Sequence, residues 1–162
     1  MEANIIYIPL LFSLLGLVYM FIRAVWVRKQ DPGNDRMKEI SASIKDGALA
    51  FLNAEYRLLF IFVIIASIAL YSISLSVTST SWMIVPAFIL GAVFSALAGN
   101  IGMRIATEAN ARTAEAAKTS LPKALQVSFG GGTVMGLGVA GLAVFGLSLF
   151  CLLYTSPSPR DL

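Results

Sequence analysis

The stretch LLFIFVIIASIALYSISLSV, residues 58–77, decides the fold of this chain because it contains no charged residue. Its many β-branched residues would favour a strand in water. In lipid, however, each backbone N–H and C=O must be paired within its own segment, so an apolar run of about 20 residues predicts a transmembrane helix. The whole 162-residue chain has the same character, since 57% of its residues are hydrophobic and only 13% are charged.

Three more apolar runs flank this one, at about residues 5–26, 82–106 and 125–153. Each is long enough to cross a hydrocarbon core of about 30 Å, and the last is longer than a bilayer needs. The first run exceeds the core of a signal peptide and follows no basic residue, so we expect it to be a retained anchor. Residues 1–153 are therefore predicted to form an all-α, polytopic membrane protein with four transmembrane helices.

The basic residues predict the orientation of these spans. Seven Lys and Arg residues lie at positions 23–57, four lie at positions 104–123, and none lies between the second and third spans. Basic loops stay in the cytoplasm, so the N-terminus is expected outside and the two basic loops inside. This placement also accounts for the net charge of +3, and we do not expect nucleic acid as a partner.

Two of the predicted spans continue as helices on the cytoplasmic side. After a turn at residues 31–34, apolar residues recur at helical spacing, at Met37, Ile40, Ile44, Ala48 and Phe51. After the third span, Arg104, Glu108 and Arg112 follow at intervals of four, and Glu115 and Lys118 come next. Such alternating charge is typical of a solvated helix face. Ser120 is predicted to cap the fourth span.

Several kinds of chemistry are excluded by the residue types. The chain has no histidine and one cysteine, Cys151, which excludes histidine metal sites, Ser-His-Asp triads and Cys-His nucleophiles. No charge lies in the middle of any predicted span, whereas ion pumps place ionisable groups at membrane depth. Asn100 lies inside the third span, and we expect it to donate an interhelical hydrogen bond. We assign no catalytic, cofactor-binding or metal-binding residue.

The glycines of the fourth span favour helix packing over nucleotide binding. Residues 136–141 match the pattern GxGxxG, but no strand precedes them and no acidic residue follows about 20 positions later. The run at 130–133 lacks the lysine of a phosphate loop. Small residues recur at every fourth position in two stripes that predict close helix contacts. The stripes are Ser128, Gly132, Gly136 and Ala140 in the fourth span, and Gly91, Ser95 and Gly99 in the third.

Three stretches resemble the membrane-integral, ion-translocating pyrophosphatases. The segment AFLNAEY at residues 50–56, after the Gly-Ala pair at 47–48, is similar to the entry of a membrane helix in that family. The segments GNIGMRIA at 99–106 and ANARTAEAA at 109–117 are similar to a further, more specific stretch of the family. Residues 124–150 resemble the helix that follows. The resemblance covers most of residues 1–150.

The resemblance implies an all-helical dimer of about sixteen spans that hydrolyses pyrophosphate at a cytoplasmic funnel and moves H⁺ or Na⁺ across a bacterial cytoplasmic membrane. It implies Mg²⁺ as a cofactor and K⁺ as a second candidate. The family's acidic motif of the DVGADLVGKVE type is absent here, so this chain is expected to be the N-terminal, outer-helix portion of such a pump, inactive alone. The alternative is a small four-helix membrane scaffold or assembly protein without enzymatic activity.

The chain changes character after about Phe150. Residues 154–162, YTSPSPRDL, are polar and rich in proline. They resemble translated adaptor or vector sequence, and we expect them to be non-native; the alternative is a genuine disordered C-terminal tail.

Overall fold

The computed structural model describes residues 3–77 and 82–155, and this part of the chain forms four helices. The helices are α1 (Ala3–Arg28), α2 (Asp35–Ser76), α3 (Ile84–Ala117) and α4 (Leu121–Thr155). All four are long and apolar enough to cross a membrane. The predicted all-α, four-span architecture is therefore confirmed. The predicted non-native tail comprises residues 154–162, of which 156–162 lie outside the described part of the chain. The non-native origin of the tail stays a prediction.

Helices α2 and α3 extend beyond their apolar runs, as the sequence indicates. The turn at residues 31–34 leads into α2, whose first backbone N–H groups are capped because Asn34 Oδ1 accepts a hydrogen bond from Met37 N at 2.9 Å. Ser120 Oγ accepts a longer bond of 3.4 Å from Lys123 N at the start of α4. Pro86 lies in the first turn of α3. Backbone N–H groups in a first turn have no partner within the helix, so the N–H that proline lacks costs no intrahelical bond.

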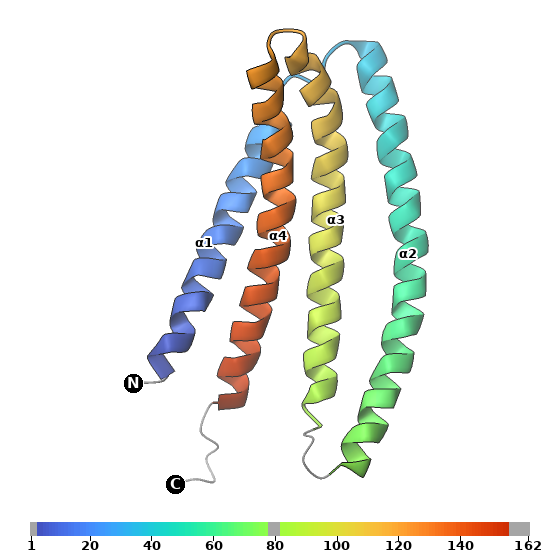
Figure 1. The fold of residues 1–162 in the computed structure, drawn as a ribbon. Coiled ribbons are helices and arrows are strands. Elements are labelled where there is room, and N and C mark those ends of the chain that lie inside the picture. The colour runs from blue at the N-terminus through green and yellow to red at the C-terminus, as the bar shows by residue number, and fades with distance from the viewer. Residues whose placement is uncertain (1–2, 78–81, 156–162) are drawn as a thin grey trace.

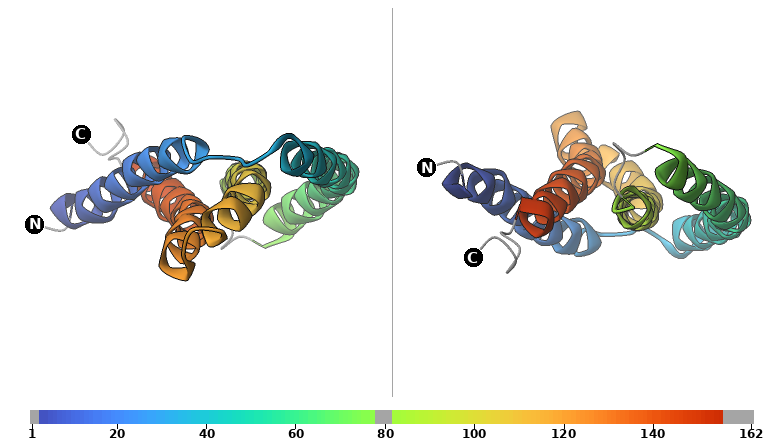
Figure 2. Two further views of the ribbon diagram at one scale, coloured as in Figure 1. Left: turned by 90° about the horizontal axis from the view of Figure 1, so that it is seen from above. Right: turned by 90° about the horizontal axis from the view of Figure 1, so that it is seen from below.

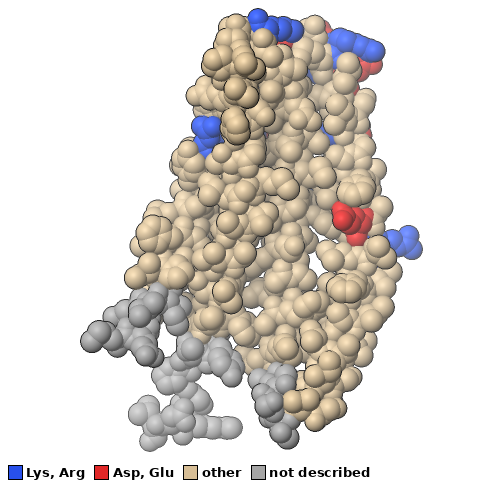
Figure 3. All heavy atoms as spheres, in the orientation of Figure 1, with Lys and Arg blue, Asp and Glu red and all other residues tan. Residues whose placement is uncertain are grey.

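The helices do not follow one another in space in chain order. Helix α4 packs between α1 and α3, and α2 packs against α3 alone among the described helices (Figure 1). The views along the bundle show the same order, α1, α4, α3, α2, with the α1–α2 connection passing beside α3 (Figure 2). The α1–α2 and α3–α4 connections share one end of the bundle, where most of the Lys and Arg side chains on the visible face gather (Figure 3).

The buried core is small and lies where α1, α3 and α4 meet. Val27 and Val134 are 0% exposed and Ile105 is 1% exposed, and Met20, Ala24 and Ala109 complete this cluster. Many large apolar side chains point outward instead, such as Phe12 at 68%. Lipid is as apolar as these side chains, so their exposure on a membrane protein carries no penalty.

The glycines of the two predicted stripes make no close approach within the described bundle, and their packing against other helices stays a prediction. A Cβ on Gly91, Gly132 or Gly136 would meet nothing within 4 Å. The close approaches use other glycines: a Cβ on Gly131 would lie 2.9 Å from the Cβ of Ala109, and one on Gly146 would lie 2.6 Å from the ring of Phe94. Helix α4 carries glycine on several faces, and spacing alone does not show which face meets a neighbour.

Helix α2 also lies deeper relative to α3 than the predicted spans imply. Tyr56 Oη donates a hydrogen bond of 2.6 Å to the carbonyl oxygen of Ala96, which lies near the middle of the apolar run of α3. Glu55 and Arg57, which flank Tyr56 and are exposed, therefore stand level with that apolar run. At about 1.5 Å per residue, they lie roughly 12 Å deeper than Arg104 of α3. No predicted span carries a charge at its own middle. Glu55 and Arg57 of α2 nevertheless lie at the depth of the middle of the apolar run of α3.

The packing of glycine predicts opposite effects at two adjacent positions. Gly131→Ala places a methyl group against Ala109, which is fixed to its backbone and cannot move aside, and overpacking of this kind costs about 1–3 kcal/mol. Gly132→Ala adds the same group in open space and gains helix propensity of up to about 1 kcal/mol. Thermal unfolding of both variants in detergent, followed by circular dichroism, should lower the midpoint for the first variant only. Equal midpoints would contradict the assigned contact.

Candidate functional site

Glu108 of α3 joins three helices at the loop end of the bundle. Its Oε2 lies 2.9 Å from Nε of Arg28 at the end of α1, and its Oε1 lies 3.1 Å from Nζ of Lys45 on α2. The Glu108 side chain is 17% exposed, so solvent screens these ion pairs less than it screens pairs on an open surface. One carboxylate therefore holds α1 and α2 against α3, although α1 and α2 do not contact each other among the described residues.

Arg112, one turn further along α3, binds the free end of α1. Its Nη2 donates to the carbonyl oxygen of Arg28 at 3.1 Å, and its Nε donates to that of Gln30 at 3.1 Å. Its Nη1 donates to the backbone oxygen of Glu108 at 2.7 Å. The last carbonyls of a helix have no partner within the helix, and a guanidinium supplies several donors at once. Arg112 thus caps α1 from a neighbouring helix.

The α1–α2 connection is held by local chemistry as well. The N–H of Gly33 donates to Oδ1 of Asp31 at 2.8 Å, which closes the predicted turn. Gly33 has a φ of 87°, a left-handed conformation that side chains other than that of glycine rarely adopt. A Cβ at this position would also lie 2.6 Å from Oε2 of Glu115 on α3. Glycine is therefore required here by both its backbone conformation and its neighbour.

The prediction of a solvated charged face on α3 is only partly correct. Arg104 and Lys118 are exposed, and Lys118 pairs with Glu115. Glu108, however, forms its ion pairs with residues of other helices, because α3 lies between α1 and α2 at this level. Asn100 Oδ1 accepts a bond of 2.7 Å from Nε of Arg104 within α3, so the bond shown for Asn100 is not the expected interhelical one.

The charges around Glu108 also change its protonation. Glu108 lies on the charged extension of α3, beyond the apolar run that ends near Ala106. Burial raises the pKa of this carboxyl, but the hydrogen bonds and the positive charges of Arg28 and Lys45 outweigh burial, and the pKa lies below its ordinary value. Glu108 is thus held as a carboxylate that accepts bonds from two cations.

Arg23 of α1 lies below this network, further from the loop end of the bundle. Its guanidinium carbon lies 4.4 Å from the centroid of the Trp26 ring, one turn nearer the loop end. A Cβ on Gly130 of α4 would lie 3.0 Å from Nη2 of Arg23 and 3.0 Å from the Trp26 ring. The glycine therefore leaves room on α4 for the long side chain to reach toward the loop end.

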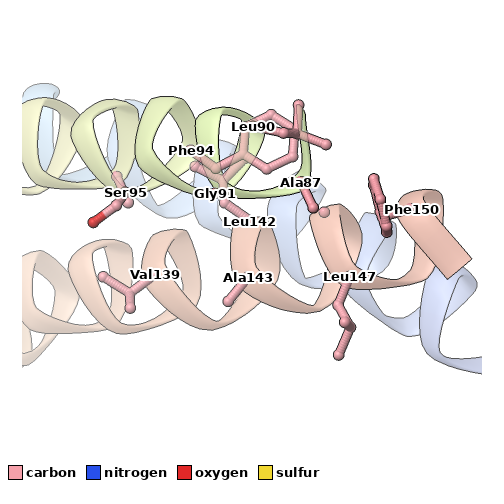
Figure 4. A pocket seen from close by; sticks show the side chains of 12 residues that line it. Ala87, Leu90, Gly91, Phe94, Ser95, Val139, Leu142, Ala143, Leu147 and Phe150 are labelled. Atoms are coloured by element: carbon pink, nitrogen blue, oxygen red, sulfur yellow. The ribbon is translucent and has the colours of Figure 1, made fainter. Parts of the chain in front are cut away.

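A hollow lies between α3 and α4, nearer the opposite end of the bundle, and has a volume of about 380 Å³ (Figure 4). The described residues that line it are apolar or small, and none of them is ionisable: Ala87, Leu90, Gly91, Phe94, Ser95 and Ala98 on α3, and Val139, Leu142, Ala143, Gly146, Leu147 and Phe150 on α4. Gly91 and Ser95, two members of the predicted α3 stripe, line it. Such a surface suits packing against another apolar element rather than acid-base chemistry.

The glycine motifs form no phosphate cradle. Residues 130–133 and 136–141 lie inside the continuous helix α4, where backbone N–H groups bond within the helix and are not available to a ligand. Among residues 3–77 and 82–155, no group of three or more His, Cys, Asp or Glu side chains is placed to hold a metal ion. The assignment of no catalytic, cofactor or metal residue stays a prediction.

The fold and its polar end define a multi-pass α-helical membrane protein whose loop end is tied together by charge. Comparison with known sequences identifies the family. The sequence model of the family described as "Inorganic H+ pyrophosphatase" matches residues 14–161. The chain belongs to this family.

Individual relatives agree with this assignment. The chain is 44% identical over 154 residues to a K(+)-stimulated pyrophosphate-energized sodium pump of Thermotoga maritima, with 91% of this chain and 20% of the relative covered. It is 41% identical over 153 residues to a K(+)-insensitive pyrophosphate-energized proton pump of Pyrobaculum aerophilum, with 93% and 21% covered. A proton pump of the same description from Methanosarcina mazei is 40% identical, with 95% and 22% covered. The chain thus spans about a fifth of the length of these relatives.

The network around Glu108 predicts a stability effect. Glu108→Gln removes the charge that Arg28 and Lys45 share, and loss of hydrogen bonds to charged groups costs about 1.5–3 kcal/mol. Glu39→Gln removes an equal charge from an exposed pair with Arg36, where the effect should stay near 0.5 kcal/mol. Unfolding midpoints in detergent measure both variants. A Glu39 variant as unstable as the Glu108 variant would contradict the structural role of Glu108.

Proposed function

We propose that this chain forms the N-terminal, outer-helix portion of a pump that couples pyrophosphate hydrolysis to the transport of H⁺ or Na⁺. The observation that carries the proposal is the family match over residues 14–161, together with relatives that are named as pyrophosphate-energized sodium and proton pumps. The competing reading, a four-helix scaffold without enzymatic activity, accounts for the helices but not for this similarity.

The role we assign to these helices is structural rather than chemical. A family of this activity implies Mg²⁺, but the acidic residues described here do not fit a magnesium site. Glu108 already accepts bonds from two cations, and Glu115 pairs with Lys118. Magnesium sites in phosphoryl transfer use carboxylates that converge on the metal and the phosphates. We therefore propose that the ligands for Mg²⁺, K⁺ and pyrophosphate come from other parts of the pump.

The outward faces of the bundle support this role. The open stripe with Gly132 and Gly136 on α4 allows another helix to approach closely, as small residues do in membranes. Glu55 and Arg57 of α2 stand at the depth of apolar residues of α3, and charges at such depth face protein or water rather than lipid. We propose that further helices of the pump cover these faces, and that the whole pump is a homodimer.

We also propose an orientation. The connections α1–α2 and α3–α4 share one end of the bundle, and most of the basic residues lie in them or in the helical turns beside them, so the positive-inside rule favours a cytoplasmic position for that end. The N-terminus then lies outside. The membrane we propose is a bacterial cytoplasmic membrane.

A chimera tests the proposed function. The segment of the Thermotoga maritima pump that matches this chain is replaced by the corresponding residues of this chain, and phosphate release from Mg-pyrophosphate is measured in membranes. We expect activity from the chimera, none from this chain alone, and a loss of at least tenfold when the chimera carries Gly131→Leu, which overpacks the α3–α4 contact. A membrane-inserted chimera without activity would count against the proposal.

Thiol labelling tests the orientation. In a Cys151→Ala background, Ser79→Cys between α2 and α3 should react with an impermeant thiol reagent added to intact cells. Thr119→Cys, in the α3–α4 connection, should react only after the cells are opened. The reverse pattern would show that the N-terminus lies inside.

A further inference from the structure

A depression of about 380 Å³ opens at the loop end of the bundle, between the end of α1, the start of α2 and the charged part of α3. Four cationic side chains line it, Arg28, Lys38, Lys45 and Arg112, together with the hydroxyl of Ser41. Among the described residues, Glu108 is the one carboxylate in its lining. The depression therefore has a marked excess of positive charge.

The surrounding carboxylates do not remove this excess. Glu108 is shared by Arg28 and Lys45, so it balances one of two charges. Arg112 donates hydrogen bonds to the backbone oxygens of Gln30, Glu108 and Arg28, which carry no net charge. Lys38 pairs with Asp35 at 3.0 Å, but the Asp35 side chain is 100% exposed, so water screens that pair strongly. An anion would meet unneutralised cations here.

The position of the depression suggests the class of anion. Arg28 and Glu108 each come two residues after the end of an apolar run, at Trp26 and Ala106. This is the level at which lipid phosphates meet the hydrocarbon core. Arg104, which is exposed, adds a cation on the same face of α3, one turn nearer the membrane.

The helix below the depression offers an apolar surface for an acyl chain. Leu97 precedes Glu108 by eleven residues, or three turns, and therefore lies on the same face of α3. It is 48% exposed. A phospholipid needs polar contacts for its headgroup and apolar contacts below them for its acyl chains. A free phosphate ion needs only the polar contacts.

We propose that this depression binds the phosphate group of an anionic phospholipid, whose acyl chains lie along α3. Basic pockets between membrane helices at the cytoplasmic side hold anionic headgroups in this way. The lipid would bridge α1 and α2, whose described residues do not contact each other. The inference does not depend on the proposed pump activity.

Lipid binding to the purified chain tests the proposal. Native mass spectrometry in a neutral detergent gives the apparent Kd for dioleoylphosphatidylglycerol and for dioleoylphosphatidylcholine, which differ in headgroup charge. We expect the anionic lipid to bind at least tenfold more tightly. Lys38→Gln, which removes a cation from the depression without touching Glu108, should weaken phosphatidylglycerol binding about fivefold.

The matched control is Arg36→Gln. Arg36 lies two residues from Lys38 and loses the same charge, but it pairs with Glu39 outside the depression, so its effect should stay below twofold. Equal weakening by the two variants, or equal affinity for the two lipids, would overturn the proposal. Displacement of phosphatidylglycerol by inorganic phosphate at a concentration near the lipid's Kd would overturn it too, because the site would then be one for a free anion.

Discussion

The absence of water in the bilayer is the constraint on which the rest of this structure depends. A backbone that cannot bond to water must bond to itself, and this requirement turns even the β-branched run of α2 into a helix. The same constraint removes the usual reason for helices to associate, because lipid is as apolar as a leucine side chain. Association must then come from close packing and from polar groups, and the bundle uses each of these at a different level.

Close packing operates in the apolar part of the bundle, where backbones approach through glycine. Gly131 meets Ala109 in the buried core at α1, α3 and α4, and Gly146 meets Phe94 nearer the opposite end of the bundle. Other faces are left open, including the hollow between α3 and α4. Because the chain spans about a fifth of the length of its relatives, we propose that further helices of the pump cover these faces.

Polar groups operate at the loop end, where water is available again. There Glu108 and Arg112 bind side chains and backbone oxygens of helices that are distant in sequence. Helix α2 shows the importance of such groups. Among the described helices it contacts α3 alone, and it is attached through Lys45 and through the bond from Tyr56 to Ala96. Its peripheral position also leaves Glu55 and Arg57 facing outward at membrane depth.

The sequence by itself determined the number of helices, their approximate bounds, the turn at residues 31–34 and the extension of α2 and α3 beyond their apolar runs. These features depend on hydropathy, backbone pairing and capping, which are local. The tertiary structure alone decided which glycines make contacts, the partners of Glu108 and the level of Arg57. Gly131 and Gly132 are adjacent and identical in type, yet only Gly131 meets a neighbouring helix. Rotation and register of one helix against another depend on the fit of whole surfaces, and residue spacing along one helix does not contain that information.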